Sequence, residues 1–162
     1  MDDYINYIGV NEDLPINIKY FKEELFDNIF IKKDDAKPIE EIISASIDQK
    51  VKSIKLLNTP IRTSNEGKKL TGKKLLIELN ISYSIRYTSN SLEKYLYVLK
   101  NNITKIIYIV VPKEIDEVNI EDFVRRKKIQ VKSFVEDLYV EKRNENSVYI
   151  RTLLLLNANI KS

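Results

Sequence analysis

The stretch that decides the fold is residues 75–87, LLIELNISYSIRY, in which apolar and polar side chains alternate. Leucine, isoleucine or tyrosine occupies every odd position from Leu75 to Tyr87, whereas the even positions include Glu78 and Asn80. Successive side chains of a β-strand point to opposite faces, so this strict period of two predicts a strand with one buried and one solvated face. A helix would distribute the same residues around its circumference.

Two further segments keep this alternation but change its phase partway. In residues 39–57 the apolar side chains change parity near Lys52 and Ser53. In residues 129–140 one parity is followed by the other, with Ile129 and Val131 first and then Phe134, Leu138 and Val140. Because one extra residue in a strand reverses its faces, both segments predict a strand with a β-bulge.

The other apolar segments predict strands joined by turns. Residues 148–160 are apolar on both parities, which is typical of a central strand covered on both sides. The polar residues 143–146 predict a hairpin turn before it. Residues 95–99 and 104–111 predict a second hairpin around Lys100-Asn101-Asn102, since asparagine tolerates positive φ.

Helix signals are few. Asn119 is a candidate cap for a short helical turn that includes Ile120 and Phe123. Pro112 is expected to end the preceding strand, because proline removes a backbone donor. The polar interval 62–74 contains two glycines and is expected to be a loop or a wide hairpin connection.

The predicted fold is therefore mostly β, an antiparallel β-sandwich or a barrel-like arrangement, with at most one or two short helices. A length of 162 residues suits a single domain over residues 1–162. Residues 1–20 are expected to be an N-terminal extension or a first strand.

Composition excludes several kinds of chemistry. The chain has no Cys and no His, which removes disulfides, thiolate ligands and the usual catalytic base. Zinc would have to be held by carboxylates alone, a poor match to its preferred ligands. We therefore expect a protein that is not an enzyme, with no catalytic residues, no cofactor and no metal site.

Charge and hydropathy bear on partners and location. The formal charge of +3 is too small to indicate nucleic acid by itself, and no apolar run is long enough to span a membrane. The N-terminus lacks the basic and apolar regions of a signal peptide, so synthesis in the cytoplasm is expected.

Charged pairs are the remaining candidates for metal or ligand sites. Adjacent acids such as Glu23-Glu24 and Glu136-Asp137 are expected to be solvated, and the lysines around Asp34-Asp35 oppose calcium binding. The basic clusters Lys68-Lys69 with Lys73-Lys74, and Arg125–Lys128, are expected to be a solvated face or to bind an acidic protein, rather than nucleic acid.

A sequence that resembles a phosphate loop lies between Gly67 and Lys74. Gly67, Gly72 and Lys73 have the required spacing, but Lys74 stands where a hydroxyl is needed, and a strand follows instead of a helix. Phosphate binding is therefore not expected there.

Six of the ten tyrosines fall in predicted strands. They are Tyr83, Tyr87, Tyr97, Tyr108, Tyr139 and Tyr149. Core packing is the favoured interpretation, and a tyrosine-rich interface is the alternative.

Four segments in order resemble a known family. They are Lys37-Pro38-Ile39-Glu40-Glu41-Ile42-Ile43, Thr59-Pro60, Glu66-Gly67-Lys68-Lys69-Leu70-Thr71-Gly72-Lys73-Lys74-Leu75 and Val135-Glu136-Asp137-Leu138-Tyr139-Val140. Together, over residues 21–160, they resemble the SPOCS domain of clostridial spore-coat and spore-morphogenesis proteins. That family has no established catalytic residues, so none are carried over.

The resemblance implies a structural protein of the bacterial spore coat or outer spore layers, deposited on the spore surface and acting by protein–protein interaction. Its expected partners are other coat proteins or further copies of itself. The alternative is a β-sandwich that binds a cell-wall glycan. Candidate partner-binding residues are Ile107 and Tyr108, in a strand expected to be either central or an incompletely protected edge, and the basic pair Arg125 and Arg126.

Overall fold

The computed structural model describes residues 4–63, 67, 69–89 and 95–161. The strands and the helix follow in the order β1 (Asn6–Ile8), β2 (Tyr20–Ile31), β3 (Glu41–Thr63), β4 (Lys69–Thr88), β5 (Leu96–Val111), β6 (Glu114–Ile115), β7 (Val118–Asn119), α1 (Ile120–Arg125), β8 (Ile129–Asn144) and β9 (Ser147–Ile160). The mostly β prediction is confirmed, and the sheets do not close into a barrel.

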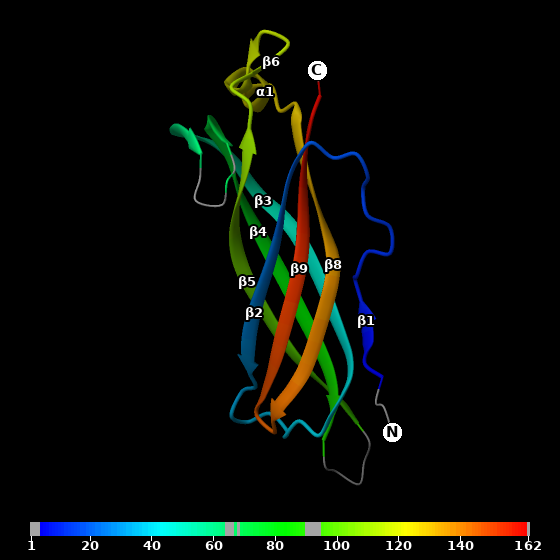
Figure 1. Ribbon diagram of the computed structural model, residues 1–162. Helices are drawn as coiled ribbons and strands as arrows, with labels where there is room; N and C mark the ends of the chain where they lie inside the picture. The colour runs from blue at the N-terminus through cyan, green and yellow to red at the C-terminus, as the bar shows by residue number, and fades with distance from the viewer. Residues whose placement is uncertain (1–3, 64–66, 68, 90–94, 162) are drawn as a thin grey trace.

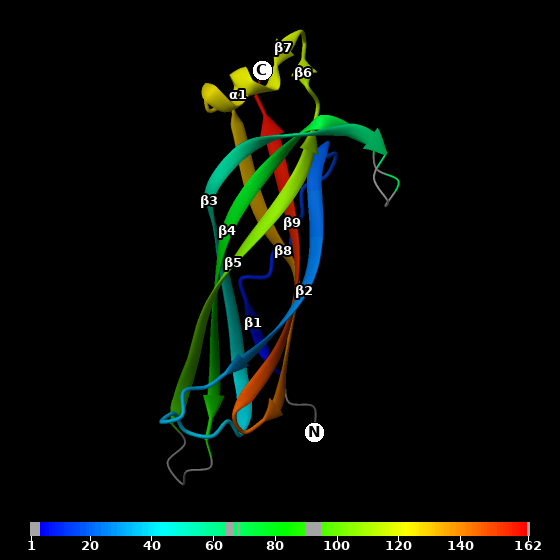
Figure 2. The same cartoon turned by 90° about the vertical axis from the view of Figure 1, so that its left-hand side faces the viewer.

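Two sheets pack face to face as a sandwich (Figures 1 and 2). Sheet A has the order β1-β3-β4-β5, and sheet B has the order β2-β9-β8. All pairs are antiparallel except β1 with β3. The small β6–β7 ladder and α1 lie together at one end, and β3 and β4 continue past the sandwich as a projecting hairpin (Figure 2).

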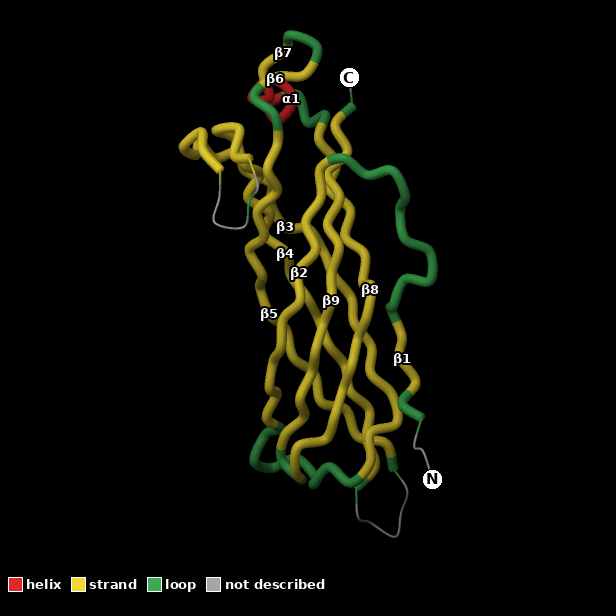
Figure 3. The backbone as a smooth tube through the Cα atoms, viewed as in Figure 1, coloured by secondary structure: helices red, strands yellow, loops and turns green. Residues whose placement is uncertain are grey.

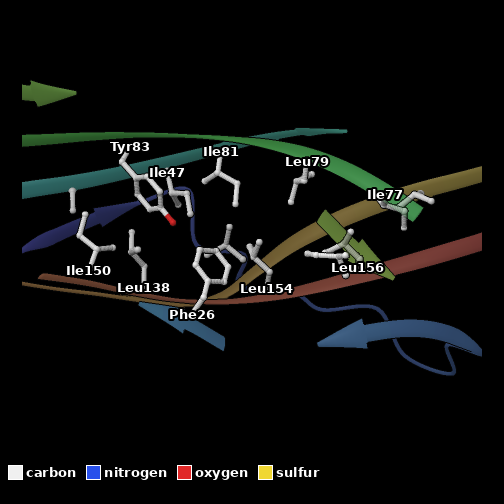
Figure 4. Close-up of a cluster of buried hydrophobic side chains, with 14 of the residues drawn as sticks. Phe26, Ile47, Ile77, Leu79, Ile81, Tyr83, Leu138, Ile150, Leu154 and Leu156 are labelled. Carbon is white, nitrogen blue, oxygen red and sulfur yellow. The ribbon is translucent and has the colours of Figure 1, made fainter. Parts of the chain in front are cut away.

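The core lies between the sheets, and the alternating stretch 75–87 supplies one wall of it. Every odd residue of that stretch is buried, from Leu75 at 0% exposure to Tyr87 at 2%. Figure 4 shows Leu79, Ile81 and Tyr83 facing side chains of sheet B such as Leu154. The strand predicted from periodicity is therefore confirmed together with its facing.

Both predicted bulges are present. The register of β3 against β4 shifts between Val51 and Ser53, as the change of parity indicated. In β8 the shift lies between Val135 and Asp137, so Phe134 precedes it and faces away from the core. The expectation that Phe134 shares a face with Leu138 was wrong, because the extra residue, Glu136, comes between them.

Several predicted connections differ from the structure. The expected hairpin at residues 100–102 is absent from the described chain, because β5 runs without interruption through those residues, pairing Asn101 with Tyr83. The interval 62–74 is strand at both ends, where β3 finishes and β4 starts. Pro112 follows the last residue of β5, and Asn119 precedes α1 but makes no side-chain capping hydrogen bond.

The N-terminal segment links the sheets. After β1, residues 9–19 pass along β8 and cross the end of sheet B to enter β2 (Figure 3). The backbone N–H of Asn11 donates to Val135 O at 2.9 Å, and Val135 N–H donates to Asn11 Oδ1 at 2.8 Å. Gly9 has φ +101, and a Cβ there would lie 2.2 Å from Ile47 O, so only glycine fits this approach to β3.

Candidate interaction surfaces

Among the described residues, no group of three or more acidic side chains is placed to hold a metal ion. Asp34 and Asp35 lie exposed in a turn after β2. In contrast, Glu24 departs from the prediction of solvated acids, because its Oε2 is buried without a hydrogen-bond partner. Glu24 alternates with exposed neighbours on β2, so its side chain points between the sheets.

The outer face of sheet B carries apolar side chains that no other described element covers. The cross-strand register places them together, with Phe21, Leu25 and Ile29 on β2, Tyr149, Leu153 and Leu155 on β9, and Phe134 and Tyr139 on β8. Leu25 is 58% exposed and Ile29 is 50% exposed. Leu155 is 3% exposed yet lies outside the interior core cluster, since its neighbours on this face bury it.

Charged side chains cross the same face. Arg151 Nε donates to Asp27 Oδ1 at 3.0 Å, joining β9 to β2. This hydrogen bond, together with one from Tyr149, lowers the pKa of Asp27. Both ion-pair side chains are about half exposed, so the pair contributes little stability but fixes charge beside apolar surface.

The β8 bulge places a further carboxylate on this face. Burial raises the pKa of Glu136, and the nearby charge of Glu23 raises it further. Two acidic side chains from β8 and β2 therefore approach each other above Leu155. No described cation is close enough to either carboxylate to form an ion pair.

The outer face of sheet A has a different character. Leu76 pairs with Tyr108 and Glu78 pairs with Ile106, so an apolar group crosses β4 and β5. Ile106 is 53% exposed and Tyr108 is 47% exposed. Lys74 Nζ lies 5.6 Å from the Tyr108 ring centroid, a favourable cation–π position.

β5 and β2 are the edge strands on one side of the sandwich and lie beside each other, whereas β1 and β8 are the edge strands on the other side (Figure 1). β5 and β2 each direct charge inward at the middle, a device that discourages strand addition. Lys105 of β5 reaches across the gap, with Nζ 4.3 Å from the Phe26 ring centroid. On β2, Glu24 Oε2 and Asn28 Nδ2 are buried in the same region without hydrogen-bond partners. The faces are therefore better placed than the β5 and β2 edges to receive another protein.

The four residues predicted to bind a partner do not form one site. Ile107 is 2% exposed and its side chain points into the core, while its strand, β5, is an edge of sheet A, the second of the two alternatives expected for it. Tyr108 is exposed on the outer face of sheet A. Arg125 and Arg126 are exposed at the end of α1, where Arg125 pairs with Asp122.

The basic clusters are interleaved with acids where they are described. Lys73 pairs with Glu121 and donates to Asn58 Oδ1 at 2.5 Å. The hydrogen bond from Lys73 lowers the pKa of the Glu121 carboxyl. Lys68 lies outside the described residues, so the phosphate-loop resemblance is described only in part; Gly72 belongs to β4, which is a strand as expected.

The six strand tyrosines divide between core and surface. Tyr83 and Tyr87 are buried, and Tyr97 and Tyr149 are half-buried. Tyr108 and Tyr139 are each 47% exposed, on the outer faces of different sheets. Core packing and surface exposure therefore both occur.

Two solvent-open depressions bear on glycan binding. One, of about 860 Å³, lies between residues 15–20 and residues 157–160, and Tyr20 is its one aromatic lining residue. The other, of about 640 Å³, is lined by residues 141–143 and Tyr149. Tyr139 packs beside Tyr149 at an interplanar angle of 65°, so the two rings do not form a flat platform for a sugar.

Local sequence does not predict the apolar outer face of sheet B. Residues 20–31 carry Phe26 and Phe30 inward and Leu25 and Ile29 outward, so no period of two marks them. The one available signal was the apolar character of both parities in residues 148–160, which was interpreted as coverage on both sides. The structure confirms that β9 is central in its sheet, but the described chain leaves its outer face open.

Within the described residues, no helix is long and apolar enough to cross a membrane. Comparison of the chain with protein-family models, with curated proteins and with solved structures finds no match.

Proposed function

We propose that this chain is a non-catalytic structural protein that works by assembling with itself or with other proteins, in the coat or outer layers of a bacterial spore. The uncovered apolar face of sheet B carries the assembly part of the proposal. The resemblance of four ordered segments to the SPOCS domain supports the spore location.

Exposure at the β2 edge of that face is the central observation. Leu25 and Ile29 lie on the same side of β2, with Asp27 between them, and each keeps half or more of its surface in solvent. Exposed apolar side chains gathered on one face of a folded domain commonly mark a protein-binding site, and here the Asp27–Arg151 ion pair adds a polar group among them. Burying both side chains against a partner would contribute roughly 1.5–3 kcal/mol to association, since the exposed half of each is worth about 0.8–1.5 kcal/mol.

The test is the size distribution of the purified protein by sedimentation velocity, alone and with candidate coat proteins. We expect concentration-dependent association of the wild type or capture of a partner, and loss of both in the variant Leu25→Ser/Ile29→Ser. Tyr95→Ser is the control, because Tyr95 is 60% exposed but directly precedes β5 of sheet A and so lies outside sheet B. Equal behaviour of both variants and the wild type would remove the apolar face from the proposal.

Location is tested separately, with a fluorescent fusion expressed in a sporulating host. The fusion is expected to move from the mother-cell cytoplasm to the spore periphery. A fusion that stays diffuse throughout sporulation contradicts the spore role while leaving the sedimentation result intact.

A second candidate function is glycan binding, favoured by the depression of about 860 Å³ with Asn17, Asn157 and Asn159 in its lining. Amide side chains of this kind hydrogen-bond sugar hydroxyls. Calorimetric titration with soluble peptidoglycan fragments tests this function. Binding that is lost in Asn157→Ala/Asn159→Ala, with association unchanged, would select the glycan function.

A further inference from the structure

The two outer faces of the sandwich carry opposite charge. On sheet A the residues that point away from the core are those paired with the even positions of β4. Six basic side chains lie on this face, Lys50, Lys52, Lys55, Lys74, Arg86 and Lys100, against three acidic ones, Glu41, Asp48 and Glu78. One of the acids is already engaged, because Lys52 Nζ lies 3.8 Å from Glu78 Oε1.

Sheet B has the reverse balance. Its outward side chains are those paired with the odd positions of β9, together with the bulge residues. Five acidic side chains lie on this face, Glu23, Asp27, Glu136, Asp137 and Glu141, against two basic ones at paired positions, Lys132 and Arg151, and Arg143 at the second bulge, which lines a depression with Glu141 and Tyr149. Asp27 is paired with Arg151, but Glu136 and Glu23 crowd each other without a described cation close enough to compensate them.

Each face also offers apolar surface. Leu76, Ile106 and Tyr108 lie on sheet A, and Leu25 and Leu153 lie on sheet B. Apolar groups inside complementary charged surroundings are the arrangement found across specific protein interfaces.

The faces are large enough for a stable contact. A strand of 14 residues such as β9 is about 46 Å long, and three strands are about 14 Å wide, so sheet B presents roughly 650 Å² before side-chain relief is counted. The three long strands of sheet A are longer. A standard interface buries about 800 Å² on each partner, so one outer face is close to that size.

We propose that copies of this chain stack, with the basic outer face of sheet A of one copy against the acidic outer face of sheet B of the next. This inference rests on the proposed assembly function and names its partner and its mode. A contact of sheet B with sheet B would oppose acidic surfaces, and a contact of sheet A with sheet A would oppose basic ones.

The stack is open-ended. The two faces lie on opposite sides of one sandwich, so each added copy presents a fresh face of either kind. Contacts between unlike surfaces give open chains unless a rotation closes them into a ring.

Charge reversal on one face at a time tests the stack. Lys50→Glu/Lys55→Glu makes sheet A acidic, and Glu23→Lys/Glu141→Lys makes sheet B basic. All four positions are exposed, and circular dichroism with thermal melting checks that each variant folds. Each two-substitution variant is expected to associate with itself at least about tenfold more weakly than the wild type, because its two faces now carry the same sign.

Two combinations restore opposite faces. An equimolar mixture of the two variants is expected to associate, since each supplies the face that the other has lost. The variant with all four substitutions carries the reversed pair and is expected to associate with itself. Raising NaCl from about 0.05 M to about 0.5 M shortens the Debye length from roughly 14 Å to roughly 4 Å and should weaken wild-type association.

The outcomes separate this inference from the proposed function. Association of the sheet A variant as tight as that of the wild type, or wild-type association that does not weaken with salt, overturns the stack and leaves assembly standing. A wild type that stays monomeric at about 100 µM and low salt also overturns the stack. The proposed function fails as well if that monomer captures no coat protein.

Discussion

A buried hydrogen bond between the sheets gives the sharpest test of the core. The hydroxyls of Tyr83 on β4 and Thr152 on β9 share a hydrogen bond of 2.7 Å across the sandwich. Thr152 is 0% exposed and Tyr83 is 3% exposed, so water cannot replace either partner. The two residues are therefore expected to depend on each other energetically.

The perturbation is the pair of near-isosteric changes Tyr83→Phe and Thr152→Val. Either change alone leaves one buried hydroxyl unpaired, which costs about 1–3 kcal/mol. The double variant removes both hydroxyls and leaves an apolar contact, which is expected to be within about 1 kcal/mol of the wild type. The losses of unfolding free energy in the two single variants should therefore add up to roughly 2 kcal/mol more than the loss in the double variant. That difference is a large part of a typical total stability of about 5–15 kcal/mol.

Urea unfolding at neutral pH measures the four free energies of unfolding, compared at equal m-values. If the losses in the two single variants add up to the loss in the double variant within about 0.5 kcal/mol, a shared buried hydrogen bond is refuted. Alkaline pH gives a second measurement, because burial raises the pKa of Tyr83 to about 12 from its ordinary value of 10.0. Between those values the unfolded state loses the proton first, so stability should fall as pH rises, and Tyr83→Phe should lessen the fall.

Three other changes test the facing, the N-terminal segment and the acidic face. Ile81→Asp puts an unpaired carboxylate into the core and should lower the free energy of unfolding by more than about 4 kcal/mol or prevent folding. Asn80→Asp on the opposite face should lower it by less than about 0.5 kcal/mol. Equal losses of Tm in the two variants would show that the assigned facing of β4 is wrong. Gly9→Ala should cost about 1–3 kcal/mol and raise hydrogen exchange in β1, because its Cβ would clash with a β3 carbonyl; unchanged exchange in β1 contradicts this. Glu136→Gln should raise Tm at pH 7, because the raised pKa of Glu136 means that its ionised carboxylate, beside Glu23, opposes folding above that pKa. The gain in Tm should vanish at low pH, where the carboxyl is protonated. A gain that does not depend on pH would exclude the charge as its cause.

Periodicity predicted the parts of the fold where one face alone is buried. Residues 75–87 alternate because β4 is central in sheet A and its other face is solvated. The same rule failed for β2, because its outward Leu25 and Ile29 are as apolar as its inward Phe26 and Phe30. It also failed at Asn101 and Asn102, where pairing with Tyr83 and Ser82 of β4 overrides the turn preference of asparagine.

The candidate surfaces depended on information that local sequence does not contain. Tyr108 was proposed as a contact from its position in an apolar strand, and its exposure follows from the parity of β5. Nothing local distinguishes it from Ile107, since which parity is buried is decided by pairing with β4. The opposite charge of the two faces becomes visible only when the strand order assigns Lys50 to sheet A and Glu141 to sheet B.

The pairing of β2 with β9 constrains when the domain can fold. β3, β4 and β5 follow one another along the chain and can form a meander as they leave the ribosome. β2 comes before them but must wait for the last strand, ending at Ile160, before its hydrogen bonds can form. Contacts so distant in sequence slow folding and leave apolar strands without partners in the meantime. Until β9 is available, premature association through the exposed apolar faces competes with folding, and a holding chaperone or a slow supply of chains would favour the native domain.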